Sequence, residues 1–336
     1  MPSSYAYINA RVRALKADLL SSETYNNLLA TASFSAFTSE LAQSPYVRAL
    51  EEAEAAGRGL TAVDSAIADN FRDITRKLLT FTDGDAETLI GLLLLRYDLN
   101  NLKAIARAKH AGRVVDDVKD SLMTVGKLKM ITTEKMLEAA DLPAAAQLLA
   151  VTKHPLSRAF SKAVRGYAGD SSLLGLELAL DRSYYQSLFA TLDKTKHSTE
   201  VERYFKREID ATNIRTALKV RGTDSASADL FISGGKEISQ DTFANLIREG
   251  GSLQDLVGTS FAEVADAPSL SEAEAIVRDS LDSSARQLYF REALGIGVVV
   301  YYLRLKEAET ARLRLLARGK FYGVPQGQLE KELGRA

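Results

Sequence analysis

Two short sequence patterns each recur three times along this chain of 336 residues. The first is an aliphatic residue, Ser or Thr, any residue, an acid, Thr or Lys, and a large apolar residue, and it occurs at 20–25, 131–136 and 238–243. The second is an acid, Asn or Arg three positions later and a basic residue two further on, and it occurs at 98–103, 210–215 and 309–314. The spacing of roughly 110 residues is the size of a small domain and predicts three related units. A body with approximate threefold symmetry suits holding a partner along its axis better than housing one catalytic cleft.

Helical periodicity dominates the chain, and only six prolines interrupt it. We expect long helices at 7–20, 87–109, 173–192, 200–220 and 286–316, the last bent around Gly295 and Gly297. The best strand candidate is the short run 230–232. The predicted fold class is therefore all-α, built from three pseudo-repeated helical units. We place these units at 1–115, 116–225 and 226–336.

Each copy of the first pattern lies where a predicted helix begins. Its hydroxyl side chain can accept a hydrogen bond from a free backbone N–H group, and its acid then lies in the first turn, where the helix dipole favours negative charge. The expected N-caps are Ser21, Thr132 and Ser239. A further recurrence, at 34–46, 143–156 and 253–261, predicts a short helix that ends in a turn.

The second pattern places an acid inside an apolar helical stripe. On a helical wheel of about 100° per residue, Asp98 lies between Leu94 and Leu102. Asp210 and Glu309 occupy the same position on their own helices. An isolated buried carboxylate costs free energy, so we expect each acid to be paired, hydrogen-bonded or close to water.

Two interpretations of these acids remain open. In the first, each acid pairs inside its own unit with an arginine or with backbone N–H groups at a helix start, because buried charges are normally paired. In the second, the acids and the polar and basic residues of the same pattern line a shared axial opening and meet a partner. The candidate residues for a structural or partner-contacting role are Asp98, Asn101, Lys103, Asp210, Asn213, Arg215, Glu309, Arg312 and Arg314.

Composition argues against several kinds of protein. With 43 basic and 44 acidic residues the formal net charge is −1, which removes the footprint expected of a nucleic-acid binder. The chain has no cysteine, and its histidines (His110, His154 and His197) show no metal-ligand spacing. We expect His154 to be a capping or surface residue. No signal peptide is visible, and the longest apolar stretch, 294–303, is about half the length needed to span a bilayer.

Catalytic candidates in the sequence are weak. Asp116, Asp117 and Asp120 match an Asp-Asp-x-x-Asp pattern that can hold magnesium against a diphosphate, but no second acidic cluster accompanies it. The run 233–236, Ser-Gly-Gly-Lys, lacks the spacing of a phosphate-binding loop and predicts a tight turn. We therefore expect no catalytic, cofactor-binding or metal-binding residue.

Four stretches of the chain resemble one known family. Residues 7–13 are similar to the opening of the C subunit of bacterial and archaeal V/A-type ATP synthases, whose eukaryotic relative is the d subunit of the V-ATPase. Residues 93–103, 210–217 and 312–325 resemble the first, middle and C-terminal signatures of that family. The resemblance covers nearly the whole chain in order. It departs at Arg312, where family members often carry Asn.

The resemblance implies a funnel-shaped, all-helical and non-catalytic rotor subunit without cofactors. Such a subunit would connect the central-stalk subunits to the membrane rotor ring of proteolipids. It would transmit torque between ATP turnover and proton or sodium transport, at the cytoplasmic face of the membrane and without a span of its own. The alternatives are a helical-repeat scaffold or adaptor unrelated to rotary ATPases and, less favoured, an all-helical enzyme that uses Asp116, Asp117 and Asp120.

Overall fold

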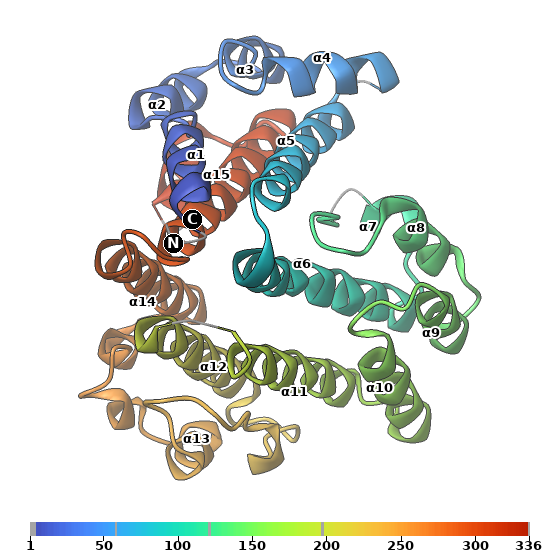
Figure 1. Ribbon diagram of the computed structural model, residues 1–336, viewed down its shortest axis with the longest axis vertical. Coiled ribbons are helices and arrows are strands. Elements are labelled where there is room, and N and C mark those ends of the chain that lie inside the picture. The colour runs from blue at the N-terminus through green and yellow to red at the C-terminus, as the bar shows by residue number, and fades with distance from the viewer. Residues whose placement is uncertain (1–4, 58, 120–121, 196–197, 335–336) are drawn as a thin grey trace. The chain divides into compact units, whose positions relative to one another are not determined.

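Helices make up the regular structure of the chain in the computed structural model, which describes residues 5–57, 59–119, 122–195 and 198–334 (Figure 1). No β-strand occurs in these ranges, so the predicted all-α class is confirmed. None of the helices described combines the length and the apolar composition that crossing a membrane requires. The chain divides into two compact units: unit 1 contains Met1–Leu180 and Tyr302–Ala336, and unit 2 contains Asp181–Tyr301.

Unit 1 combines helices from both ends of the chain. Its N-terminal part contains α1 (Ala6–Ala17), α2 (Ser22–Ala30), α3 (Phe34–Leu41), α4 (Val47–Ala56), α5 (Leu60–Thr80), α6 (Gly84–His110), α7 (Val115–Lys119), α8 (Met130–Glu138), α9 (Leu142–Val151) and α10 (Ser157–Asp170). α11 (Leu173–Leu192) leads into unit 2, and α15 (Gly297–Phe321) leads back into unit 1, where α16 (Gln326–Leu333) follows.

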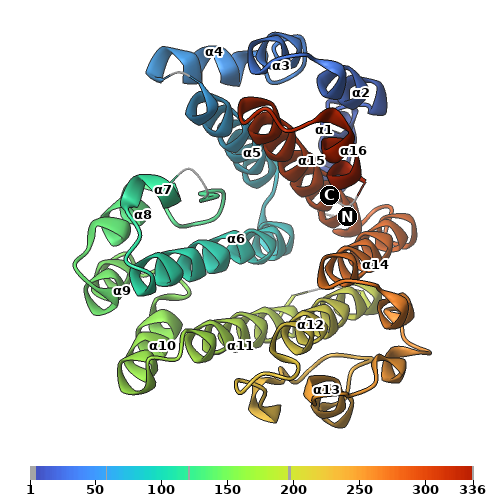
Figure 2. The ribbon, with the colours of Figure 1, turned by 180° about the vertical axis from the view of Figure 1, so that it is seen from behind.

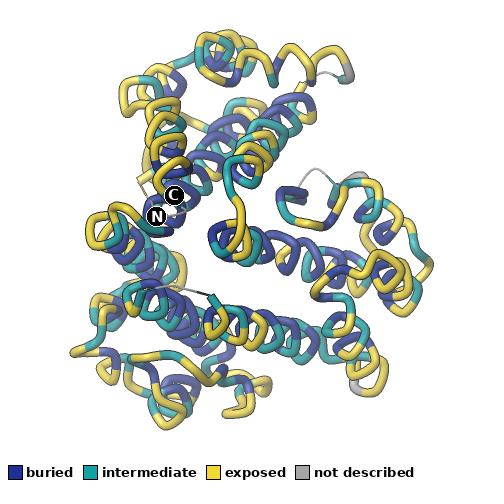
Figure 3. The backbone as a smooth tube through the Cα atoms, viewed as in Figure 1, coloured by how far each residue is buried: buried dark blue, intermediate teal, exposed yellow. Residues whose placement is uncertain are grey.

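The two ends of the chain share one hydrophobic core in unit 1. Leu28, Phe37 and Tyr46 from the N-terminal helices belong to the same buried cluster as Leu313 and Leu316 of α15. α16 packs against α2, as the view from behind shows (Figure 2). α6 is buried along most of its length (Figure 3). Unit 1 therefore cannot complete its core until the C-terminal helices have been made.

Unit 2 is built on the packing of α12 (Thr199–Val220) against α14 (Leu270–Arg291). Between these two helices the chain forms α13 (Gln240–Ile247) and three short 3₁₀ turns. The turns are η1 (Ala228–Leu230), η2 (Leu253–Leu256) and η3 (Ala262–Asp266). α13 packs against α12, so a short helix lies against a long one in this unit.

Most of the predicted helices are confirmed, but two expectations are wrong. The continuous helix at 286–316 is divided, because α14 ends at Arg291 and α15 begins at Gly297. The chain folds back between them so closely that a Cβ atom on Gly297 would lie 2.6 Å from the carbonyl oxygen of Leu288. The strand at 230–232 is absent because both backbone groups of Ile232 bond with the side-chain amide of Asn213 instead of another strand.

The fold predicts opposite effects of adding a methyl group to two glycines. Gly297→Ala places its Cβ atom against backbone and is expected to lower the free energy of unfolding by about 1–3 kcal/mol. Gly91→Ala, within α6, meets no atom nearer than 4.0 Å and is expected to raise it by up to about 1 kcal/mol. Urea unfolding followed by circular dichroism compares the two. Equal effects of the two substitutions would contradict the assigned break between α14 and α15.

Candidate functional site

The three acids of the second pattern are buried where a long helix meets the start of a short one. Asp98 and Asp210 are 0% exposed, and Glu309 is 4% exposed. They lie on α6, α12 and α15, and they bond with the chain around the starts of α8, α13 and α2, respectively. The contacts of Asp98 and Glu309 belong to unit 1 and those of Asp210 to unit 2.

Asp98 is held by two backbone groups and a histidine. It accepts hydrogen bonds from the N–H groups of Lys127 at 2.7 Å and Leu128 at 3.2 Å. Nε2 of His154 lies 3.0 Å from Asp98 Oδ2. Nδ1 of His154 accepts the N–H of Leu156 at 3.2 Å, so Nε2 carries the proton that is donated to Asp98. His154 therefore caps a turn, as expected, but at 5% exposure it is not a surface residue.

Asp210 is held by backbone groups. It accepts three N–H hydrogen bonds, from Lys236 at 2.8 Å, Glu237 at 2.9 Å and Ile238 at 3.1 Å. Burial raises the pKa of Asp210, and the three N–H groups oppose that shift because they favour the charged carboxylate. The loop passes so close to the carboxylate that Gly235 has no room for a Cβ atom. The run 233–236 therefore belongs to the loop that binds the carboxylate; it bends at Ser233 and Lys236 but contains no hydrogen-bonded turn, so the predicted tight turn is not formed.

Glu309 is held by one backbone group and two side chains. It accepts hydrogen bonds from the N–H of Leu20 at 2.6 Å and from the hydroxyl of Tyr46 at 2.8 Å. Lys306 Nζ lies 2.5 Å from Glu309 Oε1 and 2.9 Å from the Tyr46 hydroxyl. Burial lowers the pKa of Lys306, and the charge of Glu309 opposes that shift. The carboxylate thus joins α15 directly to the N-terminal part of the chain.

The backbone groups that bond with the acids lie outside the sequence intervals (1–115, 116–225 and 226–336) to which the acids were assigned. Asp98, placed in the unit 1–115, bonds with residues of the following unit, and Asp210 does the same. Glu309, placed in the last unit, bonds with Leu20 and Tyr46 of the first. Backbone N–H groups near a helix start are thus partners of all three acids, but each set belongs to the next unit rather than to the acid's own.

The N-caps of the first pattern are formed in two of its three copies. The hydroxyls of Ser21 and Ser239 each accept the N–H of the residue three positions later, at 3.1 and 3.0 Å. The cap expected at Thr132 is wrong, because α8 begins at Met130 and Lys129 is its N-cap residue without a side-chain hydrogen bond. The structurally equivalent residues that precede the caps are Leu20, Leu128 and Ile238, and each donates its N–H to an acid.

The asparagines of the second pattern pair with backbone in two copies. Asn101 exchanges two hydrogen bonds of 2.9 Å with the N–H and carbonyl of Met123, and Asn213 does the same with Ile232. In the third copy, the equivalent segment before α2 is the helix α1, whose backbone groups bond within the helix. An asparagine there would find no free pair of groups. Arg312 stands in its place, with its guanidinium over the ring of Tyr25 at 5.9 Å.

A cation eleven residues after each acid holds the far end of the same short helix. Lys320 Nζ lies 2.7 and 2.6 Å from the carbonyl oxygens of Leu29 and Thr31, where α2 ends. Lys109 donates to two carbonyl groups at the end of α8, and Arg221 donates to the carbonyl of Gly251, four residues after α13 ends. We call the acid, the cation and the short helix between them a clamp.

The geometry of the clamp follows from helix parameters. Eleven residues make about three turns, so the acid and the cation project from one face of the long helix. The acid lies near the N-terminus of the short helix and the cation near its C-terminus, which complements the helix dipole at both ends. Sequence reasoning missed Lys109, Arg221 and Lys320, although their constant spacing from Asp98, Asp210 and Glu309 was a readable signal.

The basic residues that end the second pattern are partly buried. Lys103 and Arg215 have intermediate exposure, as has Arg314. Arg314 Nε lies 3.7 Å from Oδ1 of Asp64, a residue that is 4% exposed, and Arg318 approaches the same carboxylate at 3.3 Å. In the third copy this basic residue is therefore an internal partner of α5.

The chemistry of the clamps is that of structural contacts. Their carboxylates are occupied by hydrogen-bond donors, and in the part of the chain that the structure describes no three His, Asp or Glu residues are placed to hold a metal ion. Of the acids weighed as a magnesium cluster, Asp120 lies outside the described residues, as do the side chains of Asp116 and Asp117. His197 also lies outside them.

The chain is similar to known proteins along nearly its whole length. A family model described as ATP synthase (C/AC39) subunit matches residues 8–332. The C subunit of the V-type ATP synthase of Deinococcus radiodurans is 35% identical over 334 residues, which cover 99% of this chain and 92% of the relative. The C subunit of the V-type ATP synthase of Thermus thermophilus is 33% identical and covers 99% of both chains. The C subunit of the A-type ATP synthase of Halorubrum lacusprofundi is 26% identical and covers 98% of this chain and 97% of the relative.

The acid end of a clamp is tested by Asp210→Ala. The substitution leaves three N–H groups without their acceptor, so we expect the free energy of unfolding to fall by about 3 kcal/mol or more. Asp241→Ala removes an exposed acid in the first turn of α13 and is expected to cost less than about 1 kcal/mol. Urea unfolding curves supply both values. A cost for Asp210→Ala no larger than that of Asp241→Ala would show that the carboxylate does not support the loop.

The cation end is tested by Lys320→Met, which keeps the aliphatic stem and removes the donor. We expect a loss of about 1–3 kcal/mol, because two carbonyl groups at the end of α2 lose a charged partner. Lys331→Met, at an exposed position of α16, is the matched control and should change the stability by less than about 0.5 kcal/mol. Thermal and urea unfolding of the two variants give the comparison, and equal midpoints would rule out the contribution of Lys320.

Proposed function

Because the chain belongs to the ATP synthase (C/AC39) subunit family, we propose that it is the rotor subunit that connects the central stalk to the membrane rotor ring. It is a non-catalytic subunit of a V/A-type ATP synthase. In this role it transmits torque between ATP turnover and the transport of protons or sodium ions. The observation that supports the proposal best is the match of the family model over residues 8–332, which includes all three clamps.

The clamps give a physical reason why such a chain can carry torque. A coupling element must resist shear between neighbouring helices, and a single contact leaves two helices free to pivot. Each clamp fixes a short helix at both ends, by an acid and by a cation on one long helix. The contacts are buried or partly buried, where screening by salt is weak. The arrangement is therefore stiff along the direction in which neighbouring helices would otherwise slide.

We also assign the nine candidate residues to the framework of the subunit. Asp98, Asp210 and Glu309 hold the short helices, and Asn101 and Asn213 hold the loops before two of them. Of the remaining four, Arg312 lies over Tyr25 of α2 and Arg314 faces Asp64 of α5, and we assign Lys103 and Arg215 to the framework because they occupy the same position in the pattern. We therefore expect other surface residues of the chain to make the contacts with its partners.

The three-unit arrangement belongs to the same proposal. We infer three related units near 1–115, 116–225 and 226–336, placed around a common axis as a funnel that receives the tip of the stalk. The support is that each sequence interval contains one acid and one cation of a clamp, with the same spacing of eleven residues. The protein would then lie at the cytoplasmic face of the membrane, bound to the stalk on one side and to the proteolipid ring on the other.

Recovery from native membranes tests this function. A tagged copy of the chain, expressed in the organism that encodes it, should bring down the other ATP synthase subunits from detergent-solubilised membranes. Cross-linking of the purified assembly should join it to a stalk subunit and to the proteolipid. A chain recovered only from the soluble fraction, with proteins unrelated to ATP synthase, would favour a helical adaptor instead.

A further inference from the structure

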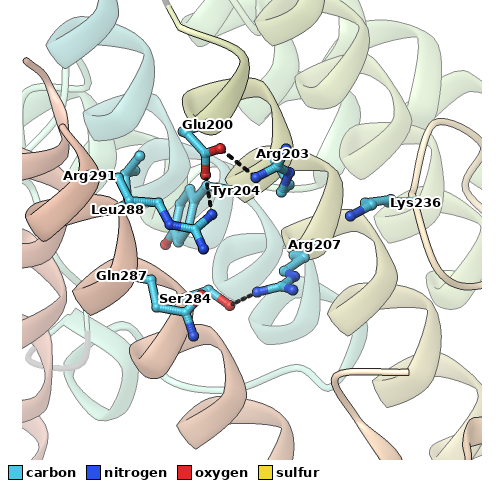
Figure 4. A pocket seen from close by; sticks show the side chains of 9 residues that line it. All are labelled: Glu200, Arg203, Tyr204, Arg207, Lys236, Ser284, Gln287, Leu288 and Arg291. Atoms are coloured by element: carbon cyan, nitrogen blue, oxygen red, sulfur yellow. Dashed lines mark hydrogen bonds and ion pairs between the residues drawn. The ribbon is translucent and has the colours of Figure 1, made fainter. Parts of the chain in front are cut away.

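Unit 2 contains a small pocket that none of the clamps uses. It has a volume of about 250 Å³ and lies between α12 and α14, with the loop before α13 at its edge. The side chains that line it include Arg203 and Arg207 from α12, Arg291 from α14, and Lys236 from the loop (Figure 4). All of them belong to one compact unit.

The pocket carries a surplus of positive charge. Its lining contains four cations (Arg203, Arg207, Lys236 and Arg291) and one carboxylate (Glu200). A second carboxylate, Glu237, lies outside the lining and approaches Arg207 Nε at 3.3 Å. Four positive and two negative charges leave a surplus of two. Like charges held this close repel one another, so a doubly charged anion would relieve the repulsion.

The arginines are fixed in place before any ligand arrives. Glu200 accepts hydrogen bonds from Arg203 and, at 2.9 Å, from Arg291. The hydrogen bond from Arg291 lowers the pKa of Glu200, so this carboxylate stays charged at neutral pH. Arg207 Nη1 donates to the hydroxyl of Ser284 at 2.8 Å, and its side chain is only 19% exposed. A guanidinium has five N–H donors, so these bonds leave donors that can face the pocket.

Lys236 adds a point charge that is not neutralised within the structure. Its side chain is exposed, and among the described residues its Nζ atom has no ion-pair partner. Its backbone N–H is the group that bonds Asp210 at 2.8 Å. An anion bound to the Lys236 side chain and to the arginines would therefore connect the loop before α13 to α12 and α14.

We propose that this pocket binds a phosphate group. Arginine forks match the tetrahedral oxygens of phosphate, lysine supplies a point charge, and the surplus of two charges equals that of a phosphate dianion at neutral pH. Gln287 and Ser284 add neutral polar groups to the lining. The volume is below the roughly 300–1,000 Å³ of pockets for drug-sized ligands, so the ligand is inorganic phosphate or a small phosphate monoester.

Calorimetric titration of the whole chain tests the site, with inorganic phosphate in one arm and glycerol phosphate in the other, at constant ionic strength set with chloride. We expect one saturable site with a Kd of about 1 mM or tighter in at least one arm. Stronger binding of the monoester would assign the site to an esterified phosphate, and stronger binding of inorganic phosphate would assign it to the free ion. Absence of saturable binding in both arms would overturn the proposal.

Matched substitutions show whether binding occurs in this pocket. Lys236→Gln keeps the backbone bond to Asp210, and Arg291→Gln alters a side chain that is 55% exposed, so both variants should fold. Each is expected to weaken phosphate binding at least tenfold.

The controls, Lys331→Gln and Arg48→Gln, remove exposed cations elsewhere, and their Kd for phosphate should stay within twofold of that of the unaltered chain. Unchanged binding in both pocket variants would place the phosphate elsewhere and overturn the assignment. The site and the rotor function are independent, because either can fail without the other.

Discussion

A carboxylate placed inside an apolar helical stripe is the constraint on which this structure depends. Burying a charge without partners costs several kcal/mol, so the surrounding chain has to supply hydrogen-bond donors. Here the donors are backbone N–H groups just before the N-cap of a short helix, where they have no intrahelical acceptor. Each such hydrogen bond therefore stabilises a buried charge and at the same time satisfies a backbone N–H group. The cation three turns later does the same for the carbonyl groups at the other end.

This constraint explains the connectivity of unit 1. Glu309 and Lys320 lie on α15, and they hold the two ends of α2. The N-terminal helices are therefore joined to the C-terminal helix by the same device that elsewhere joins consecutive segments. Thr310, Leu313 and Leu316 of α15 are buried beside these contacts, and the last two belong to the core shared by both chain ends. Under the proposed rotor function such closure is an advantage, because neither end of the chain is left to separate first.

The sequence predicts the helices well because apolar spacing and proline scarcity are local properties. It also predicts the burial of the acids, since a helical wheel needs only the residues of one helix. The individual residues that bond with the acids could not be predicted, because Asp98 and His154 are separated in sequence by α7, α8 and α9 and meet only in the folded chain. The cap at Thr132 failed because α8 begins at Met130, so the residue equivalent to Ser21 and Ser239 is Lys129, whose side chain makes no cap hydrogen bond. The sequence predicted only a bend at Gly295 and Gly297 and not the break before α15, because the close approach of Gly297 to Leu288 is visible only in the folded chain.

Buried acids hold the N–H groups that precede α2, α8 and α13. Hydrogen exchange resolved to single amides measures these bonds directly, because an amide in a loop exchanges slowly only when a stable acceptor protects it. We expect the amides of Leu20, Leu128 and Ile238 to exchange as slowly as those within neighbouring helices. Exchange at these three amides as fast as at the exposed residues Asp224 and Ser225 would show that the acids do not protect them.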